Sequence, residues 1–206
     1  MKYRMAALLC AILMLFMLTA CMGTKMVATW RDEAYHEKPA KIFIIGISSE
    51  QGPRSLVEDE FARLMKERGT KAVVSYPVLP AEPKPDKEAV LAKVREAGAD
   101  VIMVVRYLRK DMSDASTPLR RYGVPQGFST SWAGYYGGVS TDVGVRDISY
   151  DYDVISMETT LYQTETGKPI WSGLSQTSYK EGGSIKQIKP FASAIMKELA
   201  NAKIIP

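Results

Sequence analysis

The chain has 206 residues, a formal net charge of +4 and two cysteines. Its basic and acidic residues are mixed along the sequence, whereas a nucleic-acid-binding protein usually gathers its basic residues on one face. We therefore expect no nucleic acid among its partners. The length is sufficient for one domain with a hydrophobic core of its own.

The N-terminal segment, residues 1–20, has the layout of a secretory signal peptide. Lys2 and Arg4 precede an uncharged apolar run over residues 5–19, which is shorter than the roughly 20 residues that a membrane-spanning helix needs. The run ends in Leu18-Thr19-Ala20-Cys21, which resembles the lipobox of bacterial lipoproteins. The resemblance implies cleavage before Cys21 and acylation of Cys21, for example with palmitate. The alternative is an uncleaved anchor or a core helix.

Lipidation of Cys21 would determine where the protein resides. Acyl chains on this residue would anchor it stably to a membrane of the cell envelope. Met22 follows the cysteine where an Asp would favour the inner membrane, so we expect the outer membrane, facing the periplasm. Because Cys10 leaves with the signal peptide, no intramolecular disulfide is expected.

The next segment, residues 21–40, is polar and predicts a lipidated tether. Residues 41–47 form an apolar, β-branched run, as expected of a strand buried on both faces. Ser55 and Glu58 have the spacing of a helix capping box, and Gly69 stands where a helix would end. The apolar positions between them, at helical spacing, are Val57, Phe61, Leu64 and Met65.

Two further elements complete a β-α-β-α-β pattern. Residues 71–76 predict a second strand. Asp86 is placed to cap a second helix, which Gly98 ends, and residues 101–105 predict another buried strand. Strands joined by helices are expected to pair in parallel.

The C-terminal part predicts an antiparallel hairpin and a helix. Residues 154–162 and 169–179 read as strands joined by a loop with Gly167. The last helix should begin near Pro190 or kink there. We therefore predict one α/β domain over residues 41–206, with a two-layer or three-layer mixed sheet. Residues 42–47 and 101–105 should be its central strands, and the hairpin should lie at one side.

Several short motifs carry a family resemblance. They are Trp30, the 42–47 strand, Arg54 with Glu58 and Asp59, Gly69 followed by Val73-Val74-Ser75-Tyr76, and, in the hairpin, Leu161-Tyr162 and Thr166 to Trp171. Together they resemble small bacterial lipoproteins of unknown function. The layout is more distantly similar to the α/β domain of the TolB amino-terminal part, of penicillin-binding-protein activator lipoproteins and of the curli export lipoprotein. The resemblance implies an envelope role with protein partners and no catalytic residue.

Candidate catalytic and metal-binding residues are few. His36, the single histidine, lies in the expected tether, far in sequence from a nucleophile. Gly46 and Gly52 lie in the expected strand-to-helix loop, but no Gly-Lys-Ser/Thr of a phosphate-binding loop follows, so a turn that serves the helix start is the better interpretation. Asp151 and Asp153 would share one strand face, as a functional carboxylate pair or as a solvated edge. We expect no enzyme, no cofactor and no metal.

The insertion at about 109–153 is the main functional candidate, because a loop of that length inside a compact domain usually carries function or is disordered. Surface Tyr and Trp residues provide large contact areas with a polar end. Basic residues at its start, Arg109, Lys110, Arg120 and Arg121, could meet an acidic partner or anionic headgroups. The expected binding residues are Tyr122, Phe128, Trp132, Tyr135, Tyr136, Tyr150 and Tyr152.

Two alternatives remain for the insertion. Its aromatic side chains could fold back over the sheet, or the alternating residues 139–146 could form a hairpin that joins a barrel in an oligomer. The sequence thus favours a membrane-anchored, non-catalytic binding or adaptor module with an envelope protein partner. The first alternative function is a subunit of a homo-oligomeric envelope assembly or export channel. The second is an enzyme acting on envelope polysaccharide through Asp151 and Asp153.

Overall fold

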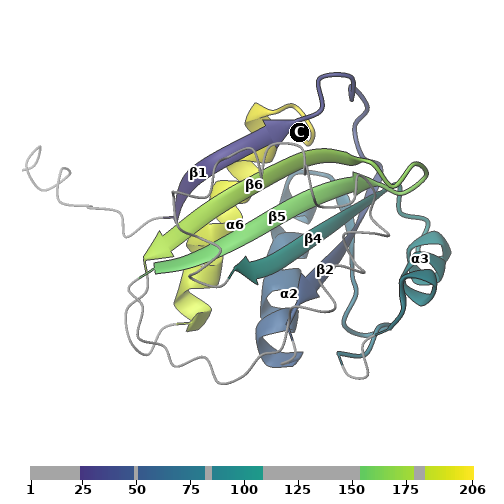
Figure 1. The fold of residues 1–206 in the computed structure, drawn as a ribbon, viewed down its shortest axis with the longest axis horizontal. Coiled ribbons are helices and arrows are strands. Elements are labelled where there is room, and N and C mark those ends of the chain that lie inside the picture. The colour runs from purple at the N-terminus through teal and green to yellow at the C-terminus, as the bar shows by residue number, and fades with distance from the viewer. Residues whose placement is uncertain (1–23, 49–50, 82–84, 109–153, 179–183) are drawn as a thin grey trace, which may run out of the picture.

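The computed structural model describes residues 24–48, 51–81, 85–108, 154–178 and 184–206. They form a six-stranded mixed sheet in the order β1-β6-β5-β4-β2-β3, accompanied by three helices (Figure 1). The predicted α/β class is confirmed. The strands are β1 (Thr24–Arg31), β2 (Lys41–Ile47), β3 (Lys71–Val74), β4 (Val101–Leu108), β5 (Val154–Gln163) and β6 (Pro169–Ser178). The helices are α2 (Gln51–Glu67), α3 (Lys87–Glu96) and α6 (Ser184–Asn201).

Strand pairing follows the sequence pattern. β2 pairs in parallel with both β3 and β4, and β4, β5, β6 and β1 follow one another in antiparallel pairs. β2 and β4 are central, as predicted, and the β5–β6 hairpin lies to one side of them. Because both faces of β2 and β4 are covered, the stretches Ile42–Ile45 and Val101–Val105 are almost completely buried.

Helices cover both faces of the sheet. α2 and α6 pack on one face, where Phe61 and Phe191 meet edge to face with ring centroids 5.5 Å apart. α3 packs on the other face through Val90 and Val94, against Phe43 of β2 and other residues of that face. The sheet therefore separates a larger core, which includes the fully buried Trp171, from a smaller one.

The predicted helix and turn signals are confirmed at four positions. The Asp86 side chain accepts a hydrogen bond of 2.7 Å from the Ala89 N–H and so caps α3. Gly69 and Gly98 follow α2 and α3 with φ of 77° and 63°, and Gly167 has φ of 67° in the β5–β6 turn. Positive φ favours glycine at these three places because it has no Cβ.

The tether predicted over residues 21–40 is wrong from Thr24 onward. Thr24–Arg31 is β1, an edge strand paired with β6, and Tyr35 in the following loop is buried. β1 has a register shift between Met26 and Ala28 and is only half-buried. An edge strand of this kind contains many polar residues, so its composition resembles that of a linker.

Three predicted boundaries also differ. α2 begins at Gln51, so Ser55 lies inside the helix and its hydroxyl donates to the Gly52 carbonyl at 3.0 Å instead of capping. β3 ends at Val74, before Ser75 and Tyr76. α6 begins at Ser184, and Pro190 lies within it.

Candidate functional site

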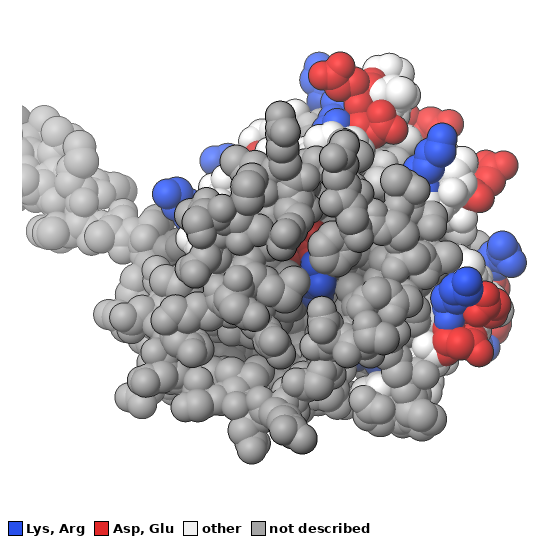
Figure 2. Space-filling model, viewed as in Figure 1, with Lys and Arg blue, Asp and Glu red and all other residues white. Residues whose placement is uncertain are grey.

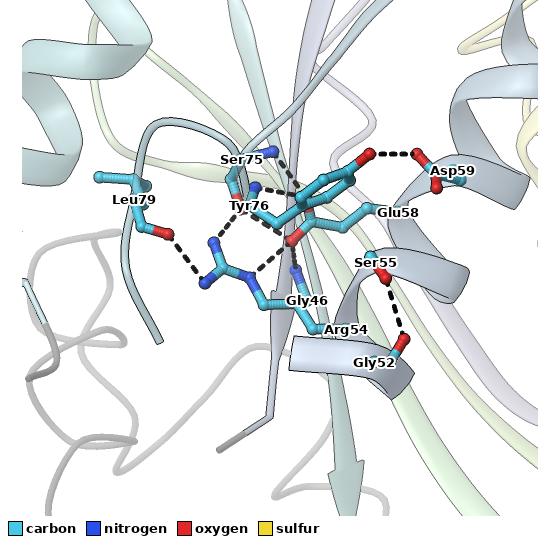
Figure 3. A network of polar contacts seen from close by, with 9 residues as sticks. All are labelled: Gly46, Gly52, Arg54, Ser55, Glu58, Asp59, Ser75, Tyr76 and Leu79. Atoms are coloured by element: carbon cyan, nitrogen blue, oxygen red, sulfur yellow. Dashed lines mark hydrogen bonds and ion pairs between the residues drawn. The ribbon is translucent and has the colours of Figure 1, made fainter. Parts of the chain in front are cut away.

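The carboxyl ends of β2 and β3 are the first place to search, because open α/β sheets bind ligands outside the carboxyl ends of their parallel strands. In this protein, two charged side chains of α2 fill that place (Figure 3). Arg54 is 5% exposed and Glu58 is 0% exposed. Buried charges are tolerated only with hydrogen-bonding partners, so their contacts determine whether a ligand could bind here.

Glu58 is surrounded by donors from three parts of the fold. Its Oε1 accepts from the Gly46 N–H at 2.9 Å, from Arg54 Nε at 2.9 Å and from the Ser75 hydroxyl at 2.8 Å. Its Oε2 accepts from the N–H groups of Ser75 at 2.5 Å and Tyr76 at 3.0 Å. Five donors occupy a carboxylate that has about four lone-pair sites. Glu58 therefore joins α2 to β2 and to the turn after β3.

Arg54 completes this network. Its Nη2 donates to the Ser75 hydroxyl at 2.6 Å and its Nη1 to the Leu79 carbonyl at 3.0 Å, as the dashed lines in Figure 3 show. The Ser75 hydroxyl therefore accepts from Arg54 while it donates to Glu58. All these groups bond within the protein, so we assign the cluster a structural role.

Gly46 and Gly52, the two glycines considered for a phosphate-binding loop, have different surroundings in the structure. Gly46 lies in β2, and a Cβ there would come within 3.3 Å of Arg54 Cγ and 3.5 Å of Glu58 Oε1. Gly52 lies in the first turn of α2 with no atom within 4 Å of the place of its Cβ. Gly46 thus gives Glu58 close access to the strand, and the side chains of Arg54 and Glu58 fill the space beside it.

A second charged pair lies on the sheet face that carries α3. Arg106 of β4 is directly opposite Glu158 of β5, and Arg106 Nε donates to Glu158 Oε2. Each residue is 7% exposed. Strand alternation places Arg106 on the same face as Ile102 and Val104, which pack in the α3 core. This pair therefore marks where that face changes from apolar to charged.

Hydroxyl side chains extend this polar region. Ser156 and Thr160 lie two residues to either side of Glu158 on β5, and the Thr160 hydroxyl is 3.0 Å from that of Ser172 on β6. Tyr162 shares this face, and its burial, with a smaller contribution from Glu158, raises the pKa of its hydroxyl. We call Arg106, Ser156, Glu158, Thr160 and Ser172 the polar face.

The polar face was not predicted from the sequence. Residues 154–162 were predicted only as a strand, and no site was expected at Ser156, Glu158 or Thr160. The signal was present, because polar residues occupy alternate positions 156, 158 and 160 of that strand, and Arg106 follows directly on an apolar run.

The insertion begins and ends beside the polar face. β4 ends at Leu108, β5 begins at Val154, and Leu108 is paired with Ser156. The two roots of the 109–153 insertion are therefore neighbours at one end of the sheet. The expected binding residues themselves, Tyr122, Phe128, Trp132, Tyr135, Tyr136, Tyr150 and Tyr152, lie outside the described residues.

Of the remaining candidate residues, the structure describes only His36. Cys21, Asp151 and Asp153 lie outside the described residues, and His36 is exposed in the loop after β1. The part of the chain that the structure describes contains no group of three potential metal ligands. None of its helices is long and apolar enough to cross a membrane. Figure 2 shows basic and acidic side chains interspersed on the described surface in that view.

Comparisons with known proteins gave only distant structural matches. No protein-family model matches the chain, and a search of characterised proteins gave no match. Among solved structures, the PelC dodecamer from Paraburkholderia phytofirmans is 9% identical, with a TM-score of 0.46, over 85% of this chain and 96% of that one. The lipoprotein GNA1162 from Neisseria meningitidis is 13% identical, with a TM-score of 0.39, over 79% of this chain and 98% of that one.

Proposed function

We propose that the protein is a lipid-anchored, non-catalytic binding or adaptor module of the bacterial cell envelope, at the outer membrane and facing the periplasm. The observation that carries the proposal is the position of β1. Only Met22 and Gly23 separate the lipobox-like Cys21 from Thr24, where β1 begins. Cleavage before Cys21 would leave every described strand and helix intact, and the lipid would be attached almost directly to the sheet.

The insertion supports the binding part of the proposal. Its roots are fixed by the pairing of Leu108 with Ser156, so the sheet can present the aromatic segment from a defined place. Aromatic residues on a rigid support are favourable for recognising a protein partner.

The described ionisable groups support a role without catalysis. Glu58 and Arg54 are engaged with each other and with the backbone, and Arg106 is paired with Glu158. A general acid or base needs an accessible proton-transfer position near a substrate. Within the described ranges, the buried carboxylates are instead occupied by donors of the protein itself.

The anchor is tested by expressing the wild type and the Cys21→Ser variant in a bacterial host with a radiolabelled or alkyne-labelled fatty acid. The wild type should carry the label and sediment with outer membranes, and the variant should carry none. A wild-type protein that keeps residues 1–20, or that carries no acyl chain, would contradict the proposal.

The binding role is tested by crosslinking in intact cells and mass spectrometry. The wild type is compared with a variant in which a short Gly/Ser turn replaces residues 122–147, inside the paired roots. Thermal unfolding should be similar in the two proteins, because β4 and β5 pair directly. A protein partner that is crosslinked only in the wild type supports the adaptor role.

Two other crosslinking results would contradict it. Crosslinks only between copies of the chain would favour a homo-oligomeric assembly, and detergent-solubilised particles should then be ring-sized. Unchanged crosslinks in the shortened variant would place the binding surface elsewhere.

A further inference from the structure

One end of the domain gathers three segments that are distant in the sequence. β1 begins there, and its Thr24 hydroxyl is 2.7 Å from that of Thr177 near the end of β6. Residues 179–183 then lead to the start of α6, which lies near the end of β6 in Figure 1. We call residues 24–27 of β1, 174–178 of β6 and 184–190 of α6 the anchor end.

The length of chain before β1 limits how far this end can be from Cys21. From Cys21 to Thr24 the backbone can span about 10 Å when fully extended. A strand of the length of β5 or β6 is about 30 Å long. A lipid on Cys21 could therefore not hold the domain at its opposite end, where the β5–β6 turn lies.

The charged residues within the three stretches of the anchor end all have one sign, and Glu60 of α2 is the acidic residue in electrostatic contact with Lys189. They are Lys25, Lys186 and Lys189, and these three stretches contain no Asp or Glu. Lys25 and Lys189 are exposed. At the far ends of β1 and α6 acidic residues occur, for example Glu33 just after β1 and Glu198 in α6. Lysines beside a bilayer are attracted to anionic headgroups.

One of the few exposed apolar side chains, Val27, lies in the anchor end. Among the described residues, the exposed large hydrophobic side chains are Val27, Leu56 and Val78. Val27 lies in the first half of β1, Leu56 in the second turn of α2, and Val78 follows the carboxyl end of β3. The described residues of the β5–β6 turn include no such side chain.

We propose that the anchor end lies against the headgroups of an anionic membrane, so that the strands rise from the bilayer and the β5–β6 turn points away from it. The proposal rests on the proposed lipidation of Cys21. The short connection from Cys21 to Thr24 keeps the anchor end close to the lipid. The exposed Lys25 and Lys189 then determine which surface of that end meets the headgroups. The roots of the insertion, at Leu108 and Val154, are then on the membrane-proximal side, because β5 begins where β6 ends.

The orientation is measured with fluorescent probes on single cysteines. The mature chain has no other free thiol if Cys21 is acylated, because Cys10 leaves with the signal peptide. The acylated protein is placed in vesicles of phosphatidylethanolamine and phosphatidylglycerol that contain a headgroup-attached quencher. Lys189→Cys and Lys197→Cys form a matched pair, because both lysines are exposed on α6 and lie about 12 Å apart along its axis. Glu165→Cys probes the β5–β6 turn.

We expect quenching to be at least about twofold stronger at position 189 than at 197, and weakest at 165. Equal quenching at the three positions, or the reverse order, would overturn the proposed orientation. Mass spectrometry of the mature N-terminus is done first. An unmodified Cys21 would refute the proposed function, whereas an acylated Cys21 without the gradient would refute only the orientation.

The role of the lysines has its own control. With the probe at position 189, Lys25→Glu should weaken the quenching there. The matched variant Lys203→Glu makes the same change in net charge at the far end and should leave the quenching unchanged. Identical effects of the two variants would overturn the assignment of Lys25 to headgroup contact.

Discussion

The indole of Trp171 occupies the space that a side chain at position 173 would need. A Cβ on Gly173 would come within 2.3 Å of Trp171 Cη2 and within 3.0 Å of Met26 Cε. Position 173 is buried between β5 and β1, so the indole has little room to move away. Because residue 173 is a glycine, the indole of Trp171 can pack directly over its Cα.

Gly173→Ala should therefore destabilise the domain by about 1–3 kcal/mol through overpacking, measured as the free energy of unfolding in urea. Gly52→Ala is the matched control, because a Cβ at that position meets no atom within 4 Å. In a protein that already carries Trp171→Leu, the Gly173→Ala substitution should cost less free energy of unfolding than it does in the wild type. Purely additive effects of the two substitutions would contradict the proposed contact.

Glu58→Gln should have a larger effect. The substitution leaves the buried Arg54 without its opposite charge and turns an amide donor toward some of the N–H groups that now donate to Glu58. Breaking a buried ion pair from one side costs about 3–5 kcal/mol. Chemical denaturation of Glu58→Gln and Glu67→Gln checks this, because Glu67 is in the same helix with a side chain 55% exposed. Similar stabilities of the two variants would contradict the structural role of the network.

The ion pair between Glu60 and Arg63 should make the stability of the fold depend on pH. The hydrogen bond from Arg63 lowers the pKa of the Glu60 carboxyl below its usual value. The folded state then binds this proton less tightly than the unfolded state, so the interaction stabilises the fold above the ordinary pKa of about 4.3. That stability is lost as the pH falls through the lowered pKa.

Glu60→Gln should accordingly lower the unfolding midpoint at about pH 7, and this effect should shrink as the pH falls below the ordinary pKa of about 4.3. The effect should be in the small range of exposed ion pairs, because Arg63 is half exposed. Glu96→Gln, at an exposed pair with Lys93, serves as the reference. A difference between Glu60→Gln and wild type that stays constant over this pH range would rule out the ion pair as its cause.

Asp86 provides a local test of helix capping. Asp86→Ala removes the acceptor for the Ala89 N–H and should lower the free energy of unfolding by about 1 kcal/mol. Asp86→Ser retains a capping oxygen and should retain most of the stability. Equal losses in both variants would show that the 2.7 Å contact does not stabilise α3.

The central strands could be predicted because burial on both faces makes their whole sequence apolar. Ile42–Ile45 and Val101–Val105 are of this kind, and their order in the sheet follows from the helices between them. β1 could not be recognised in the same way. It is half-buried, and its partner β6 lies at the other end of the chain, so no local signal marks the pairing.

The candidate sites, like the strands, could be predicted only in part from the local sequence. The spacing of Ser55 and Glu58 suggested a helix cap, whereas the role of Glu58 is set by N–H groups of β2 and of the turn after β3. The polar face was encoded in the alternation along β5. It becomes visible only when Arg106 of β4 is placed opposite Glu158.

The pairing of β1 with β6 has a consequence for biogenesis. Among the described strands, β1 comes first in the sequence and β6 last, and Thr24 is paired with Thr177. A chain exported from its N-terminus exposes β1 early, but the strand that completes its hydrogen bonds crosses the membrane near the end of translocation. Such distant pairings also form slowly. If the chain is exported and acylated as proposed, the polypeptide must therefore wait with an open strand edge, and this interval would be the period of greatest need for a periplasmic chaperone.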